Sequence, residues 1–317
     1  MAERQRHPRP SFSGMNGDRT LDAVRKDIDA VDDALHDLII RRTQLVEEVR
    51  TIKHGWPVKI QPSREAQVLY RRVAKHRGPF PKRDLCAIWR QLITATISFE
   101  GPFSVAVYAT DDEGDCWDQA RDHFGAYVPM SRHATVRSVI EAVRRQDAVV
   151  GVLPMPAHGE SDPWWRILVT SHREAPRIIG RLPFVPGGNG RRSHADALMI
   201  CPVVVVPTEH DRSFLAAEAD ERLPLDQFTQ ALAKADFKVV FATCWREETR
   251  PRAWLFLAEI EGFLDGEDPR LGSVRQALSV PLKQLVGLGG YARPIDPADL
   301  DMPPASAGHP PMRTPEP

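Results

Sequence analysis

The sequence predicts a multidomain protein in which an all-α segment of three helices is followed by two segments of mixed α/β character. Residues 21–100 contain no run typical of a β-strand, and glycine and proline clusters at 55–57 and 78–81 divide them into three helical stretches. From residue 103 onward, short apolar runs alternate with amphipathic ones, as in α/β proteins. A length of 317 residues has room for two or three domains.

The domain boundaries are predicted from changes in composition. Both ends of the chain, residues 1–20 and 302–317, are polar or proline-rich and are expected to be disordered. The pair Gly101-Pro102 is a strong signal for the end of a helix. Three domains are therefore expected, at residues 21–101, 103–212 and 222–296.

Composition and charge exclude several classes of protein. The 42 Lys and Arg residues against 43 Asp and Glu give a net charge of −1, which argues against a dedicated nucleic-acid binder. No apolar run approaches the roughly 18 residues of a membrane span, and residues 1–20 lack the apolar core of a secretory signal. We therefore expect a cytoplasmic protein that binds neither nucleic acid nor membrane.

The spacing of cysteines, histidines and glycines predicts no metal site and no cofactor. Cys86, Cys116, Cys201 and Cys244 lie far apart without a CxxC pair, as in a reducing compartment. The 11 histidines form no HxxxH or HxH pair. The glycines of 287–290 lack the strand–loop–helix setting of a dinucleotide site.

Apolar residues of the first predicted helix form a heptad seam, in which they follow one another at steps of three, four or seven residues. The seam consists of Leu21, Val24, Ile28, Val31, Leu35, Leu38, Leu45, Val49 and Ile52. The step of seven leaves a core position to Arg42. A helix over 21–53 is roughly 50 Å long at 1.5 Å per residue, longer than a domain of about 80 residues is wide. The seam therefore predicts a partner helix from a second chain, and so a homodimer.

The charge at Arg42 has two interpretations. A polar residue in a seam can fix the register of a coiled coil. Alternatively, Arg42 belongs to a set of cations that includes Arg25, Lys53 and Arg64. Several cations facing the interior of a helix bundle require anions, and two glutamates, at 65 and 100, are too few to neutralise them. This second interpretation predicts a dianionic small-molecule ligand.

These charged positions, in their spacing and type, resemble the all-helical class of chorismate mutase over about residues 18–101. The matching stretches are Leu21–Asp32, Leu38–Arg42, Lys53, Arg64-Glu65 and Trp89–Glu100. The resemblance implies an intertwined dimer in which each active site lies inside one bundle and receives one arginine from the partner. It implies chorismate as the substrate and prephenate as the product.

The resemblance assigns roles to the arginines. Arg25 would be the arginine supplied by the partner. Arg42 and Arg64 would bind the two substrate carboxylates together with Arg25. Arginine and carboxylate form bidentate pairs, which hold a flexible dianion in its reactive conformer.

The remaining roles concern the ether oxygen and the hydroxyl of the substrate. Lys53 would donate a hydrogen bond to the ether oxygen, and Glu100 would lie on its other side, where a protonated carboxyl can donate. Glu65 would accept from the substrate hydroxyl, and Thr96 stands where the family often has serine. The reaction is a unimolecular pericyclic rearrangement, so no nucleophile, metal or cofactor is needed. Donors at the ether oxygen favour the transition state, in which negative charge grows there.

Residues 103–210 resemble, more weakly, the two-lobed prephenate dehydratase domain that follows the mutase in bifunctional enzymes. Two motifs of that family are replaced. Its glycine-rich loop is the acidic stretch 109–115 here, and its Thr-Arg-Phe appears as Ala195, Asp196 and Ala197. Four acids would repel a dianion. We therefore expect a degenerate dehydratase-like domain, with a fully bifunctional mutase–dehydratase as the alternative.

Residues 224–295 resemble the regulatory ACT domain, an α+β fold, of the same bifunctional proteins. Glu248–Pro251 matches a segment of the family's phenylalanine site, whereas the companion segment Leu223–Asp226 departs from it. Two interpretations of this domain stay open. It binds an aromatic amino acid as an effector, or its fold serves dimerisation alone. A third hypothesis for the whole chain is a non-catalytic regulatory partner of an aromatic-pathway enzyme.

Overall fold

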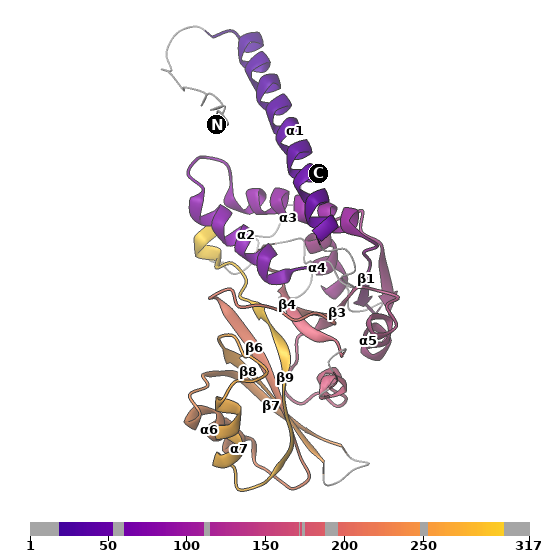
Figure 1. The fold of residues 1–317 in the computed structure, drawn as a ribbon, viewed down its shortest axis with the longest axis vertical. Helices are drawn as coiled ribbons and strands as arrows, with labels where there is room; N and C mark the ends of the chain where they lie inside the picture. Colours follow the sequence, from indigo (N-terminus) through magenta and orange to yellow (C-terminus); the bar gives the residue numbers. More distant parts are fainter. Residues whose placement is uncertain are drawn as a thin grey trace, which may run out of the picture. The chain divides into compact units, whose positions relative to one another are not determined.

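The computed structural model describes residues 19–52, 60–110, 115–170, 172, 175–187, 196–247 and 253–300. The chain divides into two compact units, residues 1–54 and 55–317. The first unit contains one helix, α1 (Leu21–Ile52), and the second contains all other described elements (Figure 1). Among the described helices, none is long and apolar enough to cross a membrane.

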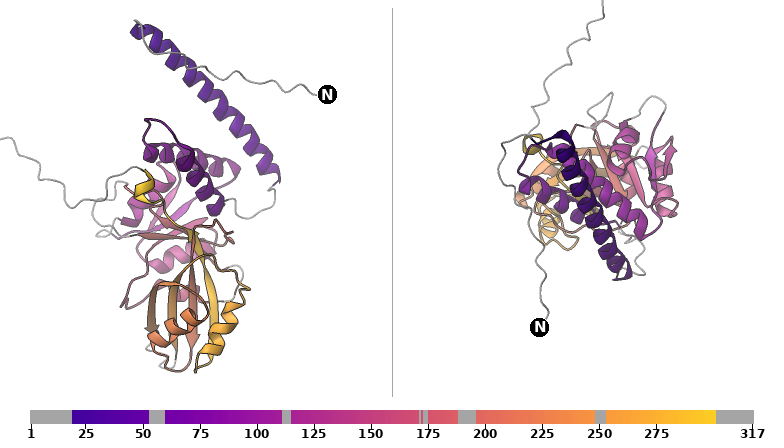
Figure 2. Two further views of the ribbon diagram at one scale, coloured as in Figure 1. Left: turned by 90° about the vertical axis from the view of Figure 1, so that its left-hand side faces the viewer. Right: turned by 90° about the horizontal axis from the view of Figure 1, so that it is seen from above.

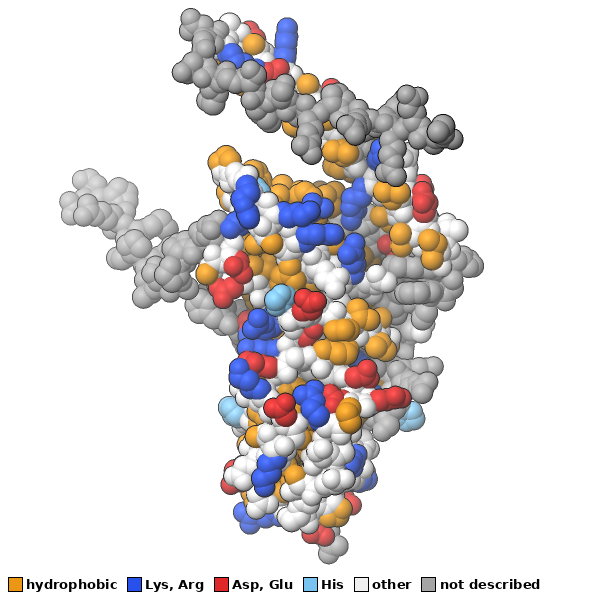
Figure 3. All heavy atoms as spheres, turned by 60° about the vertical axis from the view of Figure 1, so that its left-hand side comes forward, with side chains coloured by type: hydrophobic (Ala, Val, Ile, Leu, Met, Phe, Trp, Pro, Cys, Tyr) orange, Lys and Arg blue, Asp and Glu red, His pale blue; other side chains and the backbone are white. Residues whose placement is uncertain are grey.

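The long first helix is confirmed, and its ends follow local rules. Thr20 begins it: the Thr20 side-chain oxygen accepts from the backbone N–H of Ala23 at 3.2 Å. Asp22 in the first turn and Arg50 in the last turn complement the helix dipole. The helix has 32 residues, and none of them is buried. Apolar side chains are visible along it between charged ones (Figure 3).

Two further helices complete the predicted all-α segment. Helix α2 (Pro62–Lys75) begins with a proline in its first turn, where the missing N–H costs nothing. Helix α3 (Lys82–Glu100) follows after the Gly78–Pro81 break and ends at Gly101. The inner faces of both helices pack on the α/β part of the chain. Cys86 of α3 lies with Leu69 of α2 in one apolar cluster, and Ile93 and Ile97 lie in another with the first strands.

The described part of the α/β segment after the helices contains five strands. Its elements are β1 (Val105–Tyr108), α4 (Asp115–Phe124), β2 (Met130–His133), α5 (Val136–Arg144), β3 (Val150–Pro154), the 3-10 helix η1 (Trp164–Leu168), β4 (Arg177–Leu182) and β5 (Ala197–Cys201). Strand β1 lies between β2 and β3 and is parallel to both. Strand β5 is antiparallel to β3 and to β4. The predicted mixed α/β architecture is confirmed.

The last segment has the βαββαβ order of a ferredoxin-like fold. Its elements are β6 (Asp211–Ala219), α6 (Leu225–Lys234), β7 (Val239–Arg246), β8 (Trp254–Glu261), α7 (Arg270–Ala277) and β9 (Leu282–Ala292), followed by the 3-10 helix η2 (Pro297–Leu300). These strands are antiparallel in the order β9-β6-β8-β7. Helices α6 and α7 lie on the same face of this sheet (Figure 2). Composition predicts that this domain begins at residue 222. Strand β6, which begins at Asp211, precedes that residue.

Strand β9 joins the two strand groups into one nine-stranded sheet. It pairs with β6 on one side and with β4 on the other, where Ile178 lies opposite Gly289. Gly289 has a φ of +99°, and a Cβ there would overlap the carbonyl oxygen of Ile178. A Cβ at Gly290 would overlap the carbonyl oxygen of Arg212. Gly289 and Gly290 thus serve close backbone approach.

Replacing Gly289 by alanine should destabilise the second unit by about 2–4 kcal/mol, because the new Cβ meets backbone on the neighbouring strand and the φ is unfavourable. Urea unfolding of the full chain measures the change. Gly266→Ala is the matched control, since a Cβ at Gly266 has no atom within 4 Å. Equal stability of the two variants would contradict the proposed role of Gly289.

Candidate active site

The described residues that are predicted to act on the substrate lie on three helices. Arg25 and Arg42 lie on α1 of the first unit. Arg64 and Glu65 lie in the first turn of α2, and Thr96 and Glu100 in the last turns of α3, all in the second unit. Lys53 lies outside the described residues.

On α1, the two arginines differ in surroundings. The Arg25 guanidinium is exposed and lies 3.4 Å from the carboxylate of Asp22, one turn earlier. Arg42 is half-buried and continues the apolar seam, with Leu38 and Leu45 as the flanking seam residues. These leucines are 62% and 54% exposed. Arg42 therefore projects from an apolar face that the helix leaves accessible.

Helix α3 presents two faces of different character. Its inner stripe is buried against the second unit and consists of Cys86, Arg90, Ile93, Thr94 and Ile97. Its outer stripe is not buried and consists of Leu85, Ile88, Leu92, Thr96 and Phe99. At about 100° per residue the two stripes lie roughly 145° apart around the helix. The residues of the outer stripe follow one another at steps of three and four, like those of the α1 seam. This spacing is typical of a face that packs in a helix bundle.

Thr96 and Glu100 lie one helical turn apart on or beside this outer stripe. The Thr96 hydroxyl donates to the carbonyl oxygen of Ile93 at 2.8 Å or of Leu92 at 3.0 Å, which fixes the side chain to its own helix. Both residues are half-buried, and Arg64 on α2 is exposed. These three predicted site residues are therefore left accessible by the packing of α2 and α3.

Glu65 differs from them because it is buried and already bonded within the chain. Its Oε2 accepts from Nη2 of Arg90 at 2.5 Å, and both side chains are more than nine-tenths buried. Its Oε1 accepts from the backbone N–H of Gln61 at 3.3 Å, at the start of α2. This pair ties α2 to α3. The role of Glu65 toward a substrate hydroxyl stays a prediction, and any such contact would share the carboxylate with Arg90.

Arg90 is the charged residue that the sequence analysis missed. It falls in the apolar stripe of α3, four residues after Cys86 and three before Ile93, and a cation in such a stripe is the same signal that identified Arg42. Its Nε is buried without a hydrogen-bond partner, as is Nε2 of His123 on α4. Burial, and then the charge of Arg90, lower the pKa of His123 well below its usual value. His123 is therefore neutral, and Glu65 supplies the charge that balances Arg90.

The structure describes some of the residues in the motifs predicted for the dehydratase-like and ACT-like parts. Asp196 lies just before β5 and forms an ion pair with Arg181 of β4, whose Nε donates to it at 2.9 Å. Residues 111–114 of the acidic stretch, Ala195 and Glu248–Pro251 lie outside the described residues. Among the described residues, no group of three His, Cys, Asp or Glu side chains could hold a metal ion.

Removing one partner of the Glu65–Arg90 pair should cost more than removing both. Glu65→Gln leaves a buried guanidinium without its charge partner and should destabilise the chain by about 3 kcal/mol or more. Glu65→Leu combined with Arg90→Met should restore much of that loss, because two apolar side chains need no partner. Urea unfolding of Glu65→Leu, of Arg90→Met and of the double variant gives the coupling free energy. Additive losses would mean that the two charges do not depend on each other.

Comparison with known proteins identifies the helical segment. Residues 24–101 match the family described as chorismate mutase type II. A bifunctional chorismate mutase/prephenate dehydratase from Stutzerimonas stutzeri is 29% identical over 141 residues, which are 43% of this chain and 38% of that protein. The protein of the same description from Aquifex aeolicus is 28% identical with the same coverage. The chain thus aligns with less than half the length of these curated relatives.

Solved structures are also similar, at lower identity. A prephenate dehydratase from Arthrobacter aurescens in complex with L-Phe has a TM-score of 0.45 and 12% identity, covering 65% of this chain and 93% of that chain. The prephenate dehydratase from Streptococcus mutans has a TM-score of 0.40 and 12% identity, covering 60% and 98%. The resemblance seen in the sequence is confirmed for the helical segment by the family match: residues 24–101 are similar to the chorismate mutase type II family.

Proposed function

We propose that this chain is an isomerase that converts chorismate to prephenate within a homodimer. The observation that carries the proposal is the pair of accessible bundle-forming faces, each bearing predicted site residues. The α1 seam bears Arg42, and the outer stripe of α3 bears Thr96 with Glu100 beside it. The family match of residues 24–101 supports the same conclusion.

The occupant of the α1 seam is a second copy of the chain. The helix is 32 residues long without one buried residue, and its exposed large apolar side chains run from Leu21 to Ile52. Exposed apolar area of this extent costs free energy in water. The heptad spacing fits another helix with the same spacing, which a second α1 supplies.

The chemistry needs positioning and charge stabilisation. Arg42 and Arg64, with Arg25 from the partner helix, would bind the two carboxylates and hold chorismate folded. Lys53 and a protonated Glu100 would donate to the ether oxygen as its negative charge grows. Thr96 would line the same site. The contacts to the ether oxygen strengthen in the transition state. Because the rearrangement is unimolecular and pericyclic, it requires neither a base nor a metal.

The second candidate is a bifunctional mutase–dehydratase, because the curated relatives carry that description. Against it stands Asp196, an acid bonded to Arg181 at the position that the sequence comparison gives to the family's Thr-Arg-Phe motif. Incubation of the purified chain with chorismate at neutral pH distinguishes the candidates. Accumulating prephenate supports the mutase alone, and direct phenylpyruvate supports the bifunctional enzyme. Unchanged chorismate supports the non-catalytic regulatory protein.

Arg42→Ala should lower kcat/KM for chorismate by about 10²-fold or more, because one charged contact to a carboxylate is lost in the transition state. The dimer should persist, since the apolar seam is intact. Arg41→Ala is the matched control, as it removes the same charge from the neighbouring exposed position. Activity assays with size-exclusion chromatography measure both effects. Near-normal turnover of Arg42→Ala would refute the proposed pocket.

Mixing two inactive variants should restore activity if the sites are shared. Arg25→Ala alone should be inactive, and so should Arg42→Ala. A mixed dimer contains one site with both arginines, so equal mixing with full exchange should give about a quarter of wild-type activity in a two-fold dimer. Subunit exchange is verified with two affinity tags. No recovered activity after proven exchange would mean that each site is built from one chain.

Glu100→Gln should retain activity, because the glutamine amide donates a hydrogen bond to the ether oxygen as its negative charge grows. The measurement is kcat/KM for chorismate, with folding verified by circular dichroism. Asp84→Asn, at the other end of α3, should keep wild-type activity. A loss of about 10²-fold or more in folded Glu100→Gln would remove Glu100 from the role of a hydrogen-bond donor.

A further inference from the structure

His123, near the end of α4, is a buried titratable side chain that the proposed mutase chemistry does not use. Only 8% of the residue is exposed. Helix α4 contacts both α3 and β4, and the His123 ring lies edge-on to Phe124 with the ring centroids 4.7 Å apart. His123 is therefore enclosed by protein on the inner side of α4.

The surroundings of His123 provide no acceptor for a second ring proton. Its Nε2 atom is buried and has no hydrogen-bond partner among the described residues. A neutral imidazole carries one N–H group, whereas an imidazolium carries two and must donate from both ring nitrogens. A buried donor that lacks an acceptor costs free energy. The protonated ring is therefore poorly accommodated in the folded chain.

Charged and titratable residues from four elements surround His123. Those that line the same cavities are Glu65 of α2, Arg83, Cys86 and Arg90 of α3, Arg181 of β4 and Asp122 of α4. The lining residues from β5, β9 and segment 183–185 carry no charge. Burial raises the pKa of the Cys86 thiol to about 11, so the thiol is neutral. Arg83 and Asp122 are exposed, and water weakens the action of their charges. Three charged residues then remain to act on His123.

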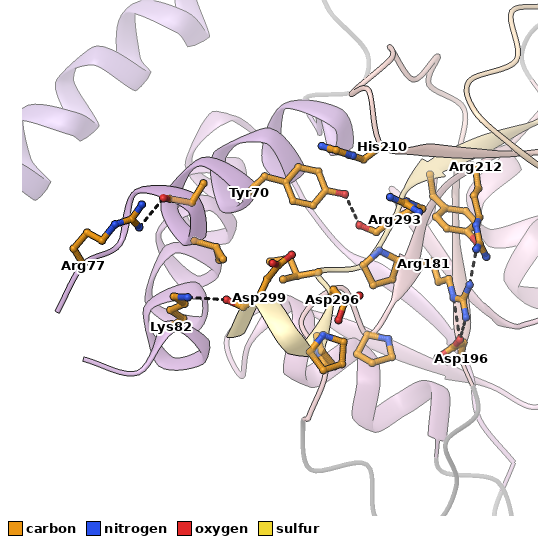
Figure 4. A pocket seen from close by; sticks show the side chains of 18 residues that line it. Tyr70, Arg77, Lys82, Arg181, Asp196, His210, Arg212, Arg293, Asp296 and Asp299 are labelled. Atoms are coloured by element: carbon orange, nitrogen blue, oxygen red, sulfur yellow. Dashed lines mark hydrogen bonds and ion pairs between the residues drawn. The ribbon is translucent and has the colours of Figure 1, made fainter. Parts of the chain in front are cut away.

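The three remaining residues leave no acid for a protonated His123. Arg181 is balanced by its ion pair with Asp196 (Figure 4). Glu65 accepts from Arg90 at 2.5 Å and, through its other oxygen, from a backbone N–H at the start of α2. Burial, and next the charge of Arg90, lower the pKa of His123 well below its usual value. A proton on His123 would therefore place a second buried cation beside the Glu65–Arg90 pair.

Two cavities beside His123 indicate where the packing opens. The first has a volume of about 20 Å³, lies against Glu65 and Arg90, and has room for a single water molecule. The second, of about 200 Å³, lies between the start of α3, the end of α4 and residues 183–185. A single water cannot hydrate two cations, so hydration of a protonated His123 requires the larger cavity to widen. Widening it moves the end of α4 away from α3.

We propose that His123 is an acid-sensitive latch, which holds the end of α4 on α3 while it is neutral and releases it when it is protonated. The opened state binds the proton more tightly than the closed state. Opening therefore becomes more favourable as pH falls below about 6.5, the usual pKa of histidine. Helix α3 also bears Thr96 and Glu100, so acid loosens the packing of a helix that carries predicted mutase residues. The inference does not rest on mutase activity, because opening is measured directly.

Backbone hydrogen exchange of the full wild-type chain, followed by mass spectrometry at about pH 7 and about pH 5, tests the latch. After correction for the intrinsic exchange rate, protection of α4 and of α3 around Arg90 should fall by up to about 25-fold at the lower pH. This is the limit for one histidine that binds its proton in the opened state alone. Strand β6, in the interior of the sheet, should keep its protection. Unchanged protection of α4 would overturn the proposal, and so would an equal loss in β6, which would mean global unfolding.

Two variants assign the pH response to His123. His123→Gln keeps a polar side chain but does not titrate, so the acid-induced loss of α4 protection should shrink to less than about 2-fold. His172→Gln, at an exposed position, is the matched control and should keep the wild-type response. Circular dichroism verifies folding, and the wild-type measurement stands by itself if His123→Gln does not fold. A full wild-type response in folded His123→Gln would overturn the proposal.

Discussion

The second unit depends on the backbone pairing between β4 and β9. Strand β9 is the last of the described strands, yet it lies in the interior of the sheet, between β4 and β6. Gly289 and Gly290 allow it to approach both neighbours closely. The core is shared across this junction, since Ile178, Phe214 and Leu288 belong to one apolar cluster. Long-range pairing of this kind fixes the strands of the α/β segment to those of the ferredoxin-like segment.

The position of β9 also determines where the chain goes next. The segment after it returns to the helices, where Ile295 and Leu300 pack in one cluster with Leu69 of α2 and Cys86 of α3. Arg293 lies on this return path and is held there by Tyr70. Strand β9 thus determines the order of the sheet and provides part of the surface on which α2 and α3 pack.

Local features of the fold could be predicted from the sequence, whereas non-local ones could not. The three helices follow from heptad spacing and from Gly/Pro breaks, which act over a few residues. Neither the start of β6 at Asp211 nor the joining of two strand groups through β9 has a local signal. Arg90 had a local signal, because it is a charge within the apolar stripe of α3. Its role as an ion-pair partner depends on Glu65, which lies 25 residues away in the sequence. The site roles of Arg25, Arg42, Arg64, Thr96 and Glu100 rest on spacing and resemblance, because they depend on a second chain and on a ligand.

The two-faced packing of α3 bears on whether the helical segment is a separable module. Its inner stripe shares its core with Phe103, Val105 and Phe124, so cutting the chain at residue 101 would remove most of the apolar cluster around Ile93 and Ile97. The fragment would then carry an uncovered apolar surface on each side of one helix and would be prone to aggregation. Selection for a folded α3 therefore acts on the α/β segment as well. That segment would be retained for its packing even if it performed no chemistry of its own.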